Sequence, residues 1–275
     1  MITDGRVAES AMENVILETI EDRIAVLTLN RPDSMNALNP ELMKSLPHAV
    51  SRLAENPDVG CVILTGAGKA FCAGGDKKAI ASGVEAMAKA AEAPSRNLTL
   101  EARVAWLRRC VEASRTLHLM RKPTIAMING ACAGAGLSLA AACDLRFAAQ
   151  SAVMTTAFVR MGLSGDYGGS WHLTRILGTA KARELYFLGD RYSADEAKQM
   201  GLVHRVCADE ELRDRTMEVA RRLVAGHPST YAYIKSNMNT AETATLEESL
   251  EQEALHMMLA RRALMDAQKN AAAEK

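Results

Sequence analysis

The sequence predicts an α/β protein built from stacked β-β-α turns and followed by a C-terminal helical region. Apolar strands alternate with helices up to about residue 148, and mostly helical patterns follow Asp144. Two glycine-rich loops, FCAGGD at 71–76 and NGACAGAGLSLA at 129–140, each come directly after an apolar strand. This repeated arrangement favours stacked turns with right-handed crossovers over one open nucleotide-binding sheet.

The first elements follow from local patterns. Residues Val15 to Leu29 alternate like a hairpin with a turn near Glu21-Asp22. Asn39 can cap a helix that begins at Pro40, and apolar residues at helical spacing continue it to Leu53. Pro47 inside this helix predicts a kink. A short apolar strand then covers Cys61 to Leu64.

The later elements repeat the alternation. We expect a helix over Glu101 to Met120, a strand over Thr124 to Ile128, a loop over Asn129 to Gly136 that leads into a short helix, and a strand over Leu145 to Ala148. Ser193 and Glu196 form a predicted capping box, with Gly201 ending that helix. A last helix is expected from about Leu246 to Ala267.

Length and composition limit the functional classes. The 275 residues suffice for one core, expected over 1–205 with the N-terminal hairpin, and a C-terminal helical region over 206–275. Lys plus Arg equals Asp plus Glu at 33 each, so no net field favours nucleic acid or a membrane surface as a partner. No run of about 18 apolar residues occurs, the N-terminus has no leader pattern, and the six cysteines are scattered, so we expect a cytoplasmic protein.

Several familiar motifs can be excluded. The stretch Gly66-Ala-Gly68-Lys69 lacks Walker spacing, and Gly134-x-Gly136 lacks the third glycine of a dinucleotide fingerprint. No pattern of His and Cys residues suggests a metal, so none is expected. Ser138 is not in a G-x-S-x-G elbow, which argues against a serine nucleophile.

The two glycine-rich loops are the strongest chemical signal. Glycine lets a backbone approach a ligand closely, and N–H groups at a helix start carry partial positive charge. Two such turns can share one developing oxyanion. Either loop taken alone is more simply explained as a tight turn.

Four segments in order resemble the crotonase, or enoyl-CoA hydratase/isomerase, superfamily. They are LNRPDSMNALN at 29–39, ILTGAGKAFCAGGDKK at 63–78, KPTIAMINGACAGAGLSLAAACDLRFA at 122–148 and GLSGDYGGSWHLTRILGTAKAREL at 162–185. The resemblance spans roughly Val15 to Lys235. It implies a β-β-α superhelix, an acyl-CoA thioester substrate, no cofactor beyond the coenzyme A carried by that substrate, and assembly as a homotrimer or a dimer of trimers.

The resemblance also implies roles for individual residues. Gly75 and Ala135 would supply the two oxyanion-hole N–H groups, and the Ala73 carbonyl would accept from the adenine of coenzyme A. The segment Arg31 to Leu38 would wrap the nucleotide. Substrate-binding candidates there and nearby are Arg31, Ser34, Asn36, Ala37 and, near the phosphates, Lys78.

Two departures from the family pattern bear on the reaction. Hydratases of the family use two glutamates, whose positions here are Ser138 and Phe158. Neither side chain is a carboxylate base, and each lost acid–base group typically costs about 10²–10⁴-fold in rate. A two-glutamate hydration mechanism is therefore disfavoured, and Phe158 becomes a candidate lining residue of an acyl pocket.

Asp166, in GLSGDYGG, corresponds to a position where some family members carry a functional aspartate. The leading hypothesis is an isomerase in which Asp166 shuttles a proton while Ser138 or Tyr167 orients substrate or water. The alternatives are a hydratase with Asp166 alone, a hydrolase or dehalogenase with Asp166 as nucleophile, and a non-catalytic acyl-CoA binder. Asp166 could also simply cap the helix that begins near Tyr167.

Overall fold

The computed structural model describes residues 15–76 and 99–273. A six-stranded sheet has the order β1-β2-β3-β5-β7-β10, in which only the β1–β2 pair is antiparallel. Its strands are β1 (Ile16–Glu21), β2 (Ile24–Leu29), β3 (Cys61–Gly66), β5 (Thr124–Ile128), β7 (Leu145–Ala149) and β10 (Arg205–Cys207). The predicted N-terminal hairpin is confirmed, with Asp22 and Arg23 both at positive φ in its two-residue turn.

A smaller sheet runs in the order β4-β6-β8-β9. It contains β4 (Ala70–Cys72), β6 (Ala131–Ala133), β8 (Val153–Thr155) and β9 (Tyr192–Ser193). Each turn of the fold places one strand in the large sheet and the next in the small sheet, as β3 and β4, β5 and β6, and β7 and β8 show. The predicted β-β-α superhelix is confirmed.

Helices cover these sheets. The structure has α2 (Pro40–Glu55), α5 (Leu100–Cys110), α6 (Glu112–Leu119), α7 (Ala135–Ala141), α8 (Gly169–Leu188), α9 (Ala194–Gln199), α10 (Leu212–Val224), α11 (Pro228–Ala241) and α12 (Leu246–Ala273), with 3₁₀ turns η1 (Pro32–Ser34) and η2 (Phe158–Met161). The Asn39 side chain caps α2 by accepting from the Leu42 N–H, and α2 continues through Pro47. The predicted capping box of Ser193 and Glu196 is also present.

Two expected elements differ from the structure. The single helix expected over Glu101 to Met120 is two helices that meet at Val111. The loop expected over Asn129 to Gly136 contains the strand β6, which pairs with β4 and β8. The strand β6 therefore forms because it pairs with strands that lie far from it along the chain.

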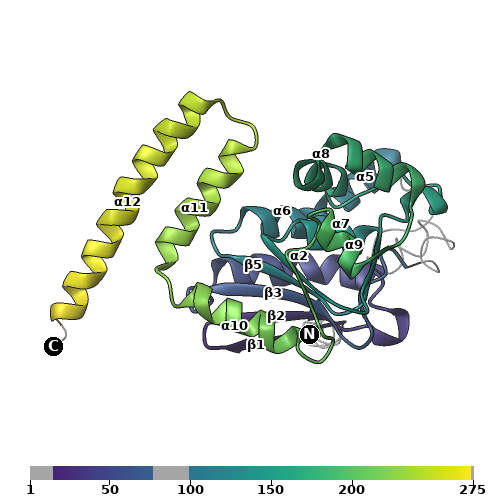
Figure 1. Cartoon of the computed structure of the whole chain (residues 1–275), viewed down its shortest axis with the longest axis horizontal. Coiled ribbons are helices and arrows are strands. Elements are labelled where there is room, and N and C mark those ends of the chain that lie inside the picture. The colour runs from purple at the N-terminus through teal and green to yellow at the C-terminus, as the bar shows by residue number, and fades with distance from the viewer. Residues whose placement is uncertain (1–14, 77–98, 274–275) are drawn as a thin grey trace, which may run out of the picture.

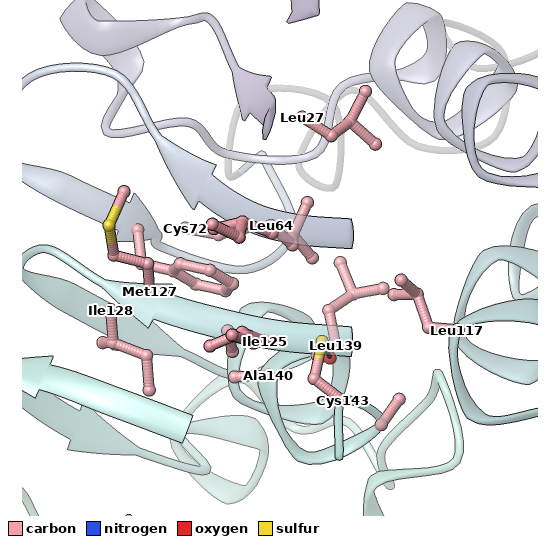
Figure 2. Packing of buried hydrophobic residues seen from close by; sticks show 14 of the residues in the cluster. Leu27, Leu64, Cys72, Leu117, Ile125, Met127, Ile128, Leu139, Ala140 and Cys143 are labelled. Atoms are coloured by element: carbon pink, nitrogen blue, oxygen red, sulfur yellow. Dashed lines mark hydrogen bonds between the residues drawn. The ribbon is translucent and has the colours of Figure 1, made fainter. Parts of the chain in front are cut away.

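The core lies between the sheets and the covering helices. Figure 2 shows Leu27, Leu64 and Ile125 of the large sheet near Cys72 of β4 and Leu139 of α7. All five side chains are fully buried. Burying a side chain of Leu or Ile size contributes about 1.5–3 kcal/mol, so this cluster helps to hold β4 and α7 against the large sheet.

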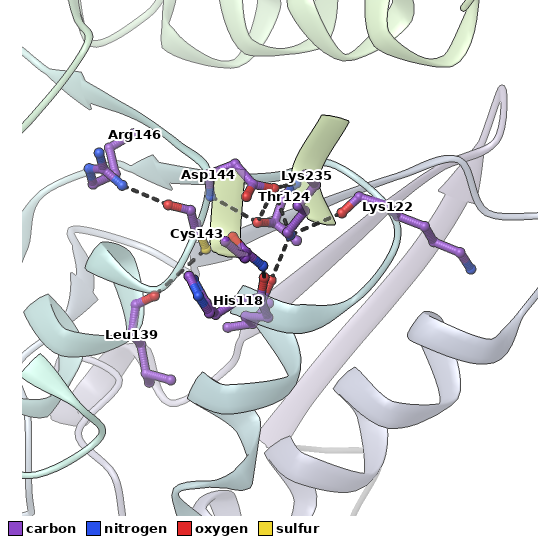
Figure 3. A network of polar contacts seen from close by, with 10 residues as sticks. His118, Lys122, Thr124, Leu139, Cys143, Asp144, Arg146 and Lys235 are labelled. Carbon is purple, nitrogen blue, oxygen red and sulfur yellow. Dashed lines mark hydrogen bonds and ion pairs between the residues drawn. The ribbon is translucent and has the colours of Figure 1, made fainter. Parts of the chain in front are cut away.

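The C-terminal region has two parts. Helix α10 packs against strands of the large sheet, whereas α11 and α12 form a hairpin that extends away from it (Figure 1). The expected boundary after residue 205 falls inside β10. Lys235 of α11 joins the hairpin to the core through Asp144, 2.8 Å away, and through the Leu117 carbonyl, 3.0 Å away (Figure 3). Within the described ranges no helix is long and apolar enough to cross a membrane.

Candidate active site

The small sheet brings the two glycine-rich loops together. Strands β4 and β6 are parallel neighbours, so the chain leaves both at the same edge. Gly74 follows β4 with φ +86, and a Cβ atom there would lie 2.8 Å from the Ala133 carbonyl oxygen and 3.5 Å from the Ala135 nitrogen. Only glycine permits this approach, because an added side chain would separate the loops.

The N–H groups of Gly75 and Ala135 are available at this junction. Leu38 forms a parallel bridge with Gly75 by donating to the Gly74 carbonyl and accepting from Asp76, which leaves the Gly75 N–H outside the bridge. Ala135 is the first residue of α7 and has no intrahelical acceptor. Among the described residues, neither N–H has a hydrogen-bond acceptor.

Helix α7 packs closely on the first loop. A Cβ atom at Gly136 would lie 2.3 Å from the Cys72 carbonyl oxygen, which is closer than any real side chain approaches. Burial raises the pKa of the Cys72 thiol to about 12, so this thiol is neutral and is not a nucleophile in the site.

Asp166 lies in a turn of unusual backbone conformation just before α8. Gly165, Tyr167 and Gly168 have φ of +112, +50 and +71. Positive φ is uncommon for a bulky residue such as Tyr167, so surrounding contacts must hold it. The Ser114 hydroxyl of α6 does so by donating to the Tyr167 carbonyl at 2.6 Å.

His172 completes this support. Its Nε2 lies 3.3 Å from Ser114 Oγ, whose proton is already given to the Tyr167 carbonyl. His172 must therefore donate from Nε2, which assigns the tautomer. Burial lowers the pKa of His172 to about 3, consistent with a neutral ring. Ser114 and His172 were not predicted from the sequence, because residues so far apart in it share no local pattern.

The Asp166 carboxyl group is largely buried and incompletely paired. Its Oδ1 atom has no hydrogen-bond partner among the described residues, and burial raises its pKa from 3.8 to about 6. The capping explanation does not hold, because the N-cap residue of α8 is Gly168. Asp166 contacts the start of the helix through its backbone carbonyl, which accepts from the Gly169 N–H, and not through its side chain. A carboxyl group of this kind is ready to accept a proton near neutral pH.

Ser138, Phe158 and Tyr167 are all buried around this turn. Ser138 donates to the Gly134 carbonyl at 3.3 Å, while the Phe158 ring lies 3.7 Å from the Cβ position of Gly134. The Tyr167 hydroxyl is buried without a partner among the described residues. Phe158 and Ser138 therefore border the second glycine loop.

The segment Arg31 to Leu38 contacts the first loop. Arg31 pairs with Asp76 at 3.1 Å and also donates to the Ala37 carbonyl. Ala73 donates its N–H to the Met35 carbonyl at 3.0 Å and is half-buried. These bonds attach the segment to the loop that carries Gly75.

Asn36 is fully buried and holds the segment internally. Its amide donates to the carbonyls of Ala67 and Ala70 at 2.9 and 2.7 Å, and its Oδ1 accepts from the Arg31 N–H. The Asn36 side chain is thus committed to protein partners, whereas Ser34 is exposed. Lys78 lies outside the described residues. Within them, no group of three His, Cys, Asp or Glu side chains could hold a metal.

Comparison with known proteins places this site in a family. The family model for enoyl-CoA hydratase/isomerase matches residues 19–269. The chain belongs to this family. The crotonase resemblance of the four sequence segments is thereby confirmed, and the protein is an acyl-CoA-handling enzyme of the hydratase/isomerase type.

Individual relatives include both kinds of enzyme. The chain is 35% identical over 254 residues to 1,2-epoxyphenylacetyl-CoA isomerase of Escherichia coli K12, covering 91% of this chain and 92% of the relative. It is 32% identical to short-chain-enoyl-CoA hydratase of Clostridium acetobutylicum, over 87% and 86% of the two chains. The crystal structure of an enoyl-CoA hydratase from Polaromonas sp. JS666 matches with a TM-score of 0.78 and 35% identity, over 88% and 90%.

Proposed function

We propose that this enzyme catalyses a proton shift in an enoyl-CoA thioester, with Asp166 as the base. The observation that carries the proposal is the largely buried Asp166 carboxyl group, whose Oδ1 lacks a partner among the described residues. The similarity to an enzyme named an isomerase also supports isomerisation over hydration. Ser138 and Phe158 stand at the two positions that the family resemblance assigns to the glutamates of hydratases.

In this mechanism the Gly75 and Ala135 N–H groups bind the thioester oxygen. A proton next to a thioester is acidic only when the enolate oxygen is stabilised, and each fixed donor is typically worth about 10²–10³-fold in rate. Ionised Asp166 removes the proton and returns it elsewhere on the same allylic system. One carboxylate suffices because it carries the proton between the two carbons.

The coenzyme A moiety is proposed to lie along the first loop. The Ala73 carbonyl would accept from the adenine, and the segment containing Arg31, Ser34 and Ala37 would border the nucleotide, with Lys78 near a phosphate. Asn36 would act indirectly, since its amide is bonded to Ala67 and Ala70. Ser138 and Tyr167 would orient the acyl group.

The direct test is Asp166→Asn, assayed with a panel of enoyl-CoA thioesters in deuterated water. Loss of the base should lower turnover by about 10²–10⁴-fold while substrate binding persists. The exposed Asp58, which lies beyond α2 at the amino end of β3, provides the matched control Asp58→Asn, expected to behave as the wild type.

The products distinguish the alternatives. Wild-type enzyme should move the double bond and exchange deuterium without net addition of water. A 3-hydroxyacyl-CoA product would instead establish hydration, and transfer of ¹⁸O from solvent to Asp166 in a single turnover would establish a nucleophilic carboxylate. Unchanged turnover in Asp166→Asn would eliminate any catalytic role for Asp166.

We also propose assembly as a homotrimer or a dimer of trimers through the C-terminal region. Helix α12 exposes many large apolar side chains, which soluble monomers rarely collect on one element: Leu246, Leu250, Leu255, Met257, Met258, Leu264 and Met265. Light scattering after size exclusion should give three or six times the chain mass of 29.7 kDa. A mass of one chain would contradict the proposal.

A further inference from the structure

Three buried oxygen atoms around the Asp166 turn lack a hydrogen-bond partner among the described residues: Asp166 Oδ1 and the hydroxyls of Tyr167 and Tyr186. Asp166 Oδ1 and the Tyr186 hydroxyl form a pair of one acceptor and one donor. Leaving a buried polar atom unpaired typically costs about 1–3 kcal/mol, and native proteins rarely retain such atoms without a reason. A bound molecule that pairs with both atoms would remove this cost.

Helix α8 places Tyr186 beside the Asp166 turn. Gly178, with φ +77 and ψ 159, interrupts the helical backbone, so the second half of α8 departs from the direction of the first. The Tyr186 hydroxyl consequently lies 3.5 Å from the Cβ position of Gly165 and 2.5 Å from that of Gly169. Asp166 sits between these two glycines, in the turn that borders the phenol.

Neighbouring rings and hydroxyls fix the Tyr186 phenol. Its ring stacks on Phe158 with centroids 5.8 Å apart and planes inclined by 7°. The Ser138 hydroxyl also borders the Cβ position of Gly169, at 2.2 Å, and lies close enough to the Tyr186 hydroxyl to favour the ionised phenol. The phenol is thus oriented by packing while its O–H remains available.

The two unpaired groups have complementary hydrogen-bonding properties. Burial, with a smaller contribution from the Asp166 carboxylate and against an opposing interaction with the Ser138 hydroxyl, raises the pKa of Tyr186 to about 12, so its phenol is a neutral donor. The Asp166 carboxylate is an acceptor above its pKa of about 6. A hydroxyl oxygen can accept one hydrogen bond and donate another, and so satisfies both.

We propose that Tyr186 and Asp166 together form a subsite for one hydroxyl oxygen, supplied by the acyl chain or by a water molecule. Tyr186 donates to this oxygen, and the hydroxyl donates to Asp166. The inference rests on the proposed function, because it places the oxygen on or beside the acyl group of an acyl-CoA. Tyr186 becomes a substrate-contacting residue that selects oxygenated acyl groups or holds water.

The test compares wild type with Tyr186→Phe, which keeps the ring stacked on Phe158 and removes only the hydroxyl. Binding is measured by calorimetry with a saturated pair, butyryl-CoA against 4-hydroxybutyryl-CoA. If the acyl chain supplies the oxygen, Tyr186→Phe should weaken a hydroxylated ligand by about 5–30-fold, as expected for one lost hydrogen bond, and leave butyryl-CoA within about twofold. Tyr233→Phe, on α11, is the control and should alter neither affinity.

If water supplies the oxygen, hydroxylated and plain ligands bind alike. Tyr186→Phe should then lower the rate at which the enoyl-CoA substrate exchanges deuterium with solvent at least about tenfold, because the water no longer has its second partner. Equal weakening of all ligands, or no change in either arm, overturns the inference. Failure of every acyl-CoA to bind overturns the proposed function as well, whereas binding without a Tyr186 effect overturns this inference alone.

Discussion

The Asp166 side chain combines burial with a proposed acid–base role, and burial of an ionised carboxylate has a measurable cost in stability. Its folded pKa of about 6 lies above the ordinary value of 3.8, so the native state binds this proton more tightly than the unfolded state. Protonation of Asp166 therefore stabilises the native state, and this contribution is fully present at low pH and is lost as pH rises from about 4 to above 6.

Asp166→Asn should consequently stabilise the protein at pH 7.5. The neutral amide avoids burying a charge, and we expect the free energy of unfolding to rise by about 1–2 kcal/mol. The difference should shrink at pH 4.5, where Asp166 is protonated in the native state. Urea denaturation at both pH values measures it. A variant destabilised equally at the two pH values would contradict the assigned pKa shift.

At the scale of secondary-structure elements, the contact between α7 and β4 sets the spacing of the glycine loops. Gly136→Ala would place a methyl group 2.3 Å from the Cys72 carbonyl oxygen, so helix and strand must separate. We expect a loss of about 2–4 kcal/mol in unfolding free energy, as for an overpacked core, and a large loss of turnover.

Gly162→Ala is the comparison for Gly136→Ala. Position 162 has φ +66 but no atom within 4 Å of its Cβ position, so only backbone strain applies. That strain should cost about 1 kcal/mol and spare activity. Equal effects of the two substitutions in thermal unfolding and in turnover would show that the α7–β4 contact has no special importance.

The same elements show what sequence could and could not predict. Asn39 with Pro40, and Ser193 with Glu196, are local signals, and the structure confirms both helix starts. Strand β6 carries no local apolar alternation, and its pairing with β4 and β8 is a long-range property. Tyr186 was missed because the break at Gly178 brings it to Asp166, and an internal glycine does not specify a change of direction.

At the scale of the whole molecule, one buried ion pair attaches the C-terminal hairpin to the core. Lys235 Nζ contacts Asp144 Oδ2 at 2.8 Å, and the same oxygen accepts from the Thr124 N–H and hydroxyl (Figure 3). This cluster connects α11 with β5 and with the residue preceding β7. Removing one partner leaves the other charge buried.

Lys235→Met should therefore loosen the hairpin. We expect a loss of about 2–4 kcal/mol in unfolding free energy and faster proteolysis between α10 and α11. Lys44→Met, at an exposed position of α2, is the matched control and should change neither measurement. Protease resistance equal to that of the wild type would show that α11 is held by other contacts.

The main-chain donors at positions 75 and 135, which have no acceptor within residues 15–76 and 99–273, have a practical consequence for mutational studies. Exchange of one side chain for another leaves a peptide N–H in place, so alanine scanning would overlook the groups proposed to hold the thioester oxygen. Replacing the peptide bond itself by an ester, through semisynthesis with a hydroxy acid at residue 75 or 135, deletes one donor and also weakens the preceding carbonyl, which accepts from Leu38 at Gly74 and from Ser138 at Gly134. Such ester-containing variants would measure the contribution of each N–H group to turnover separately.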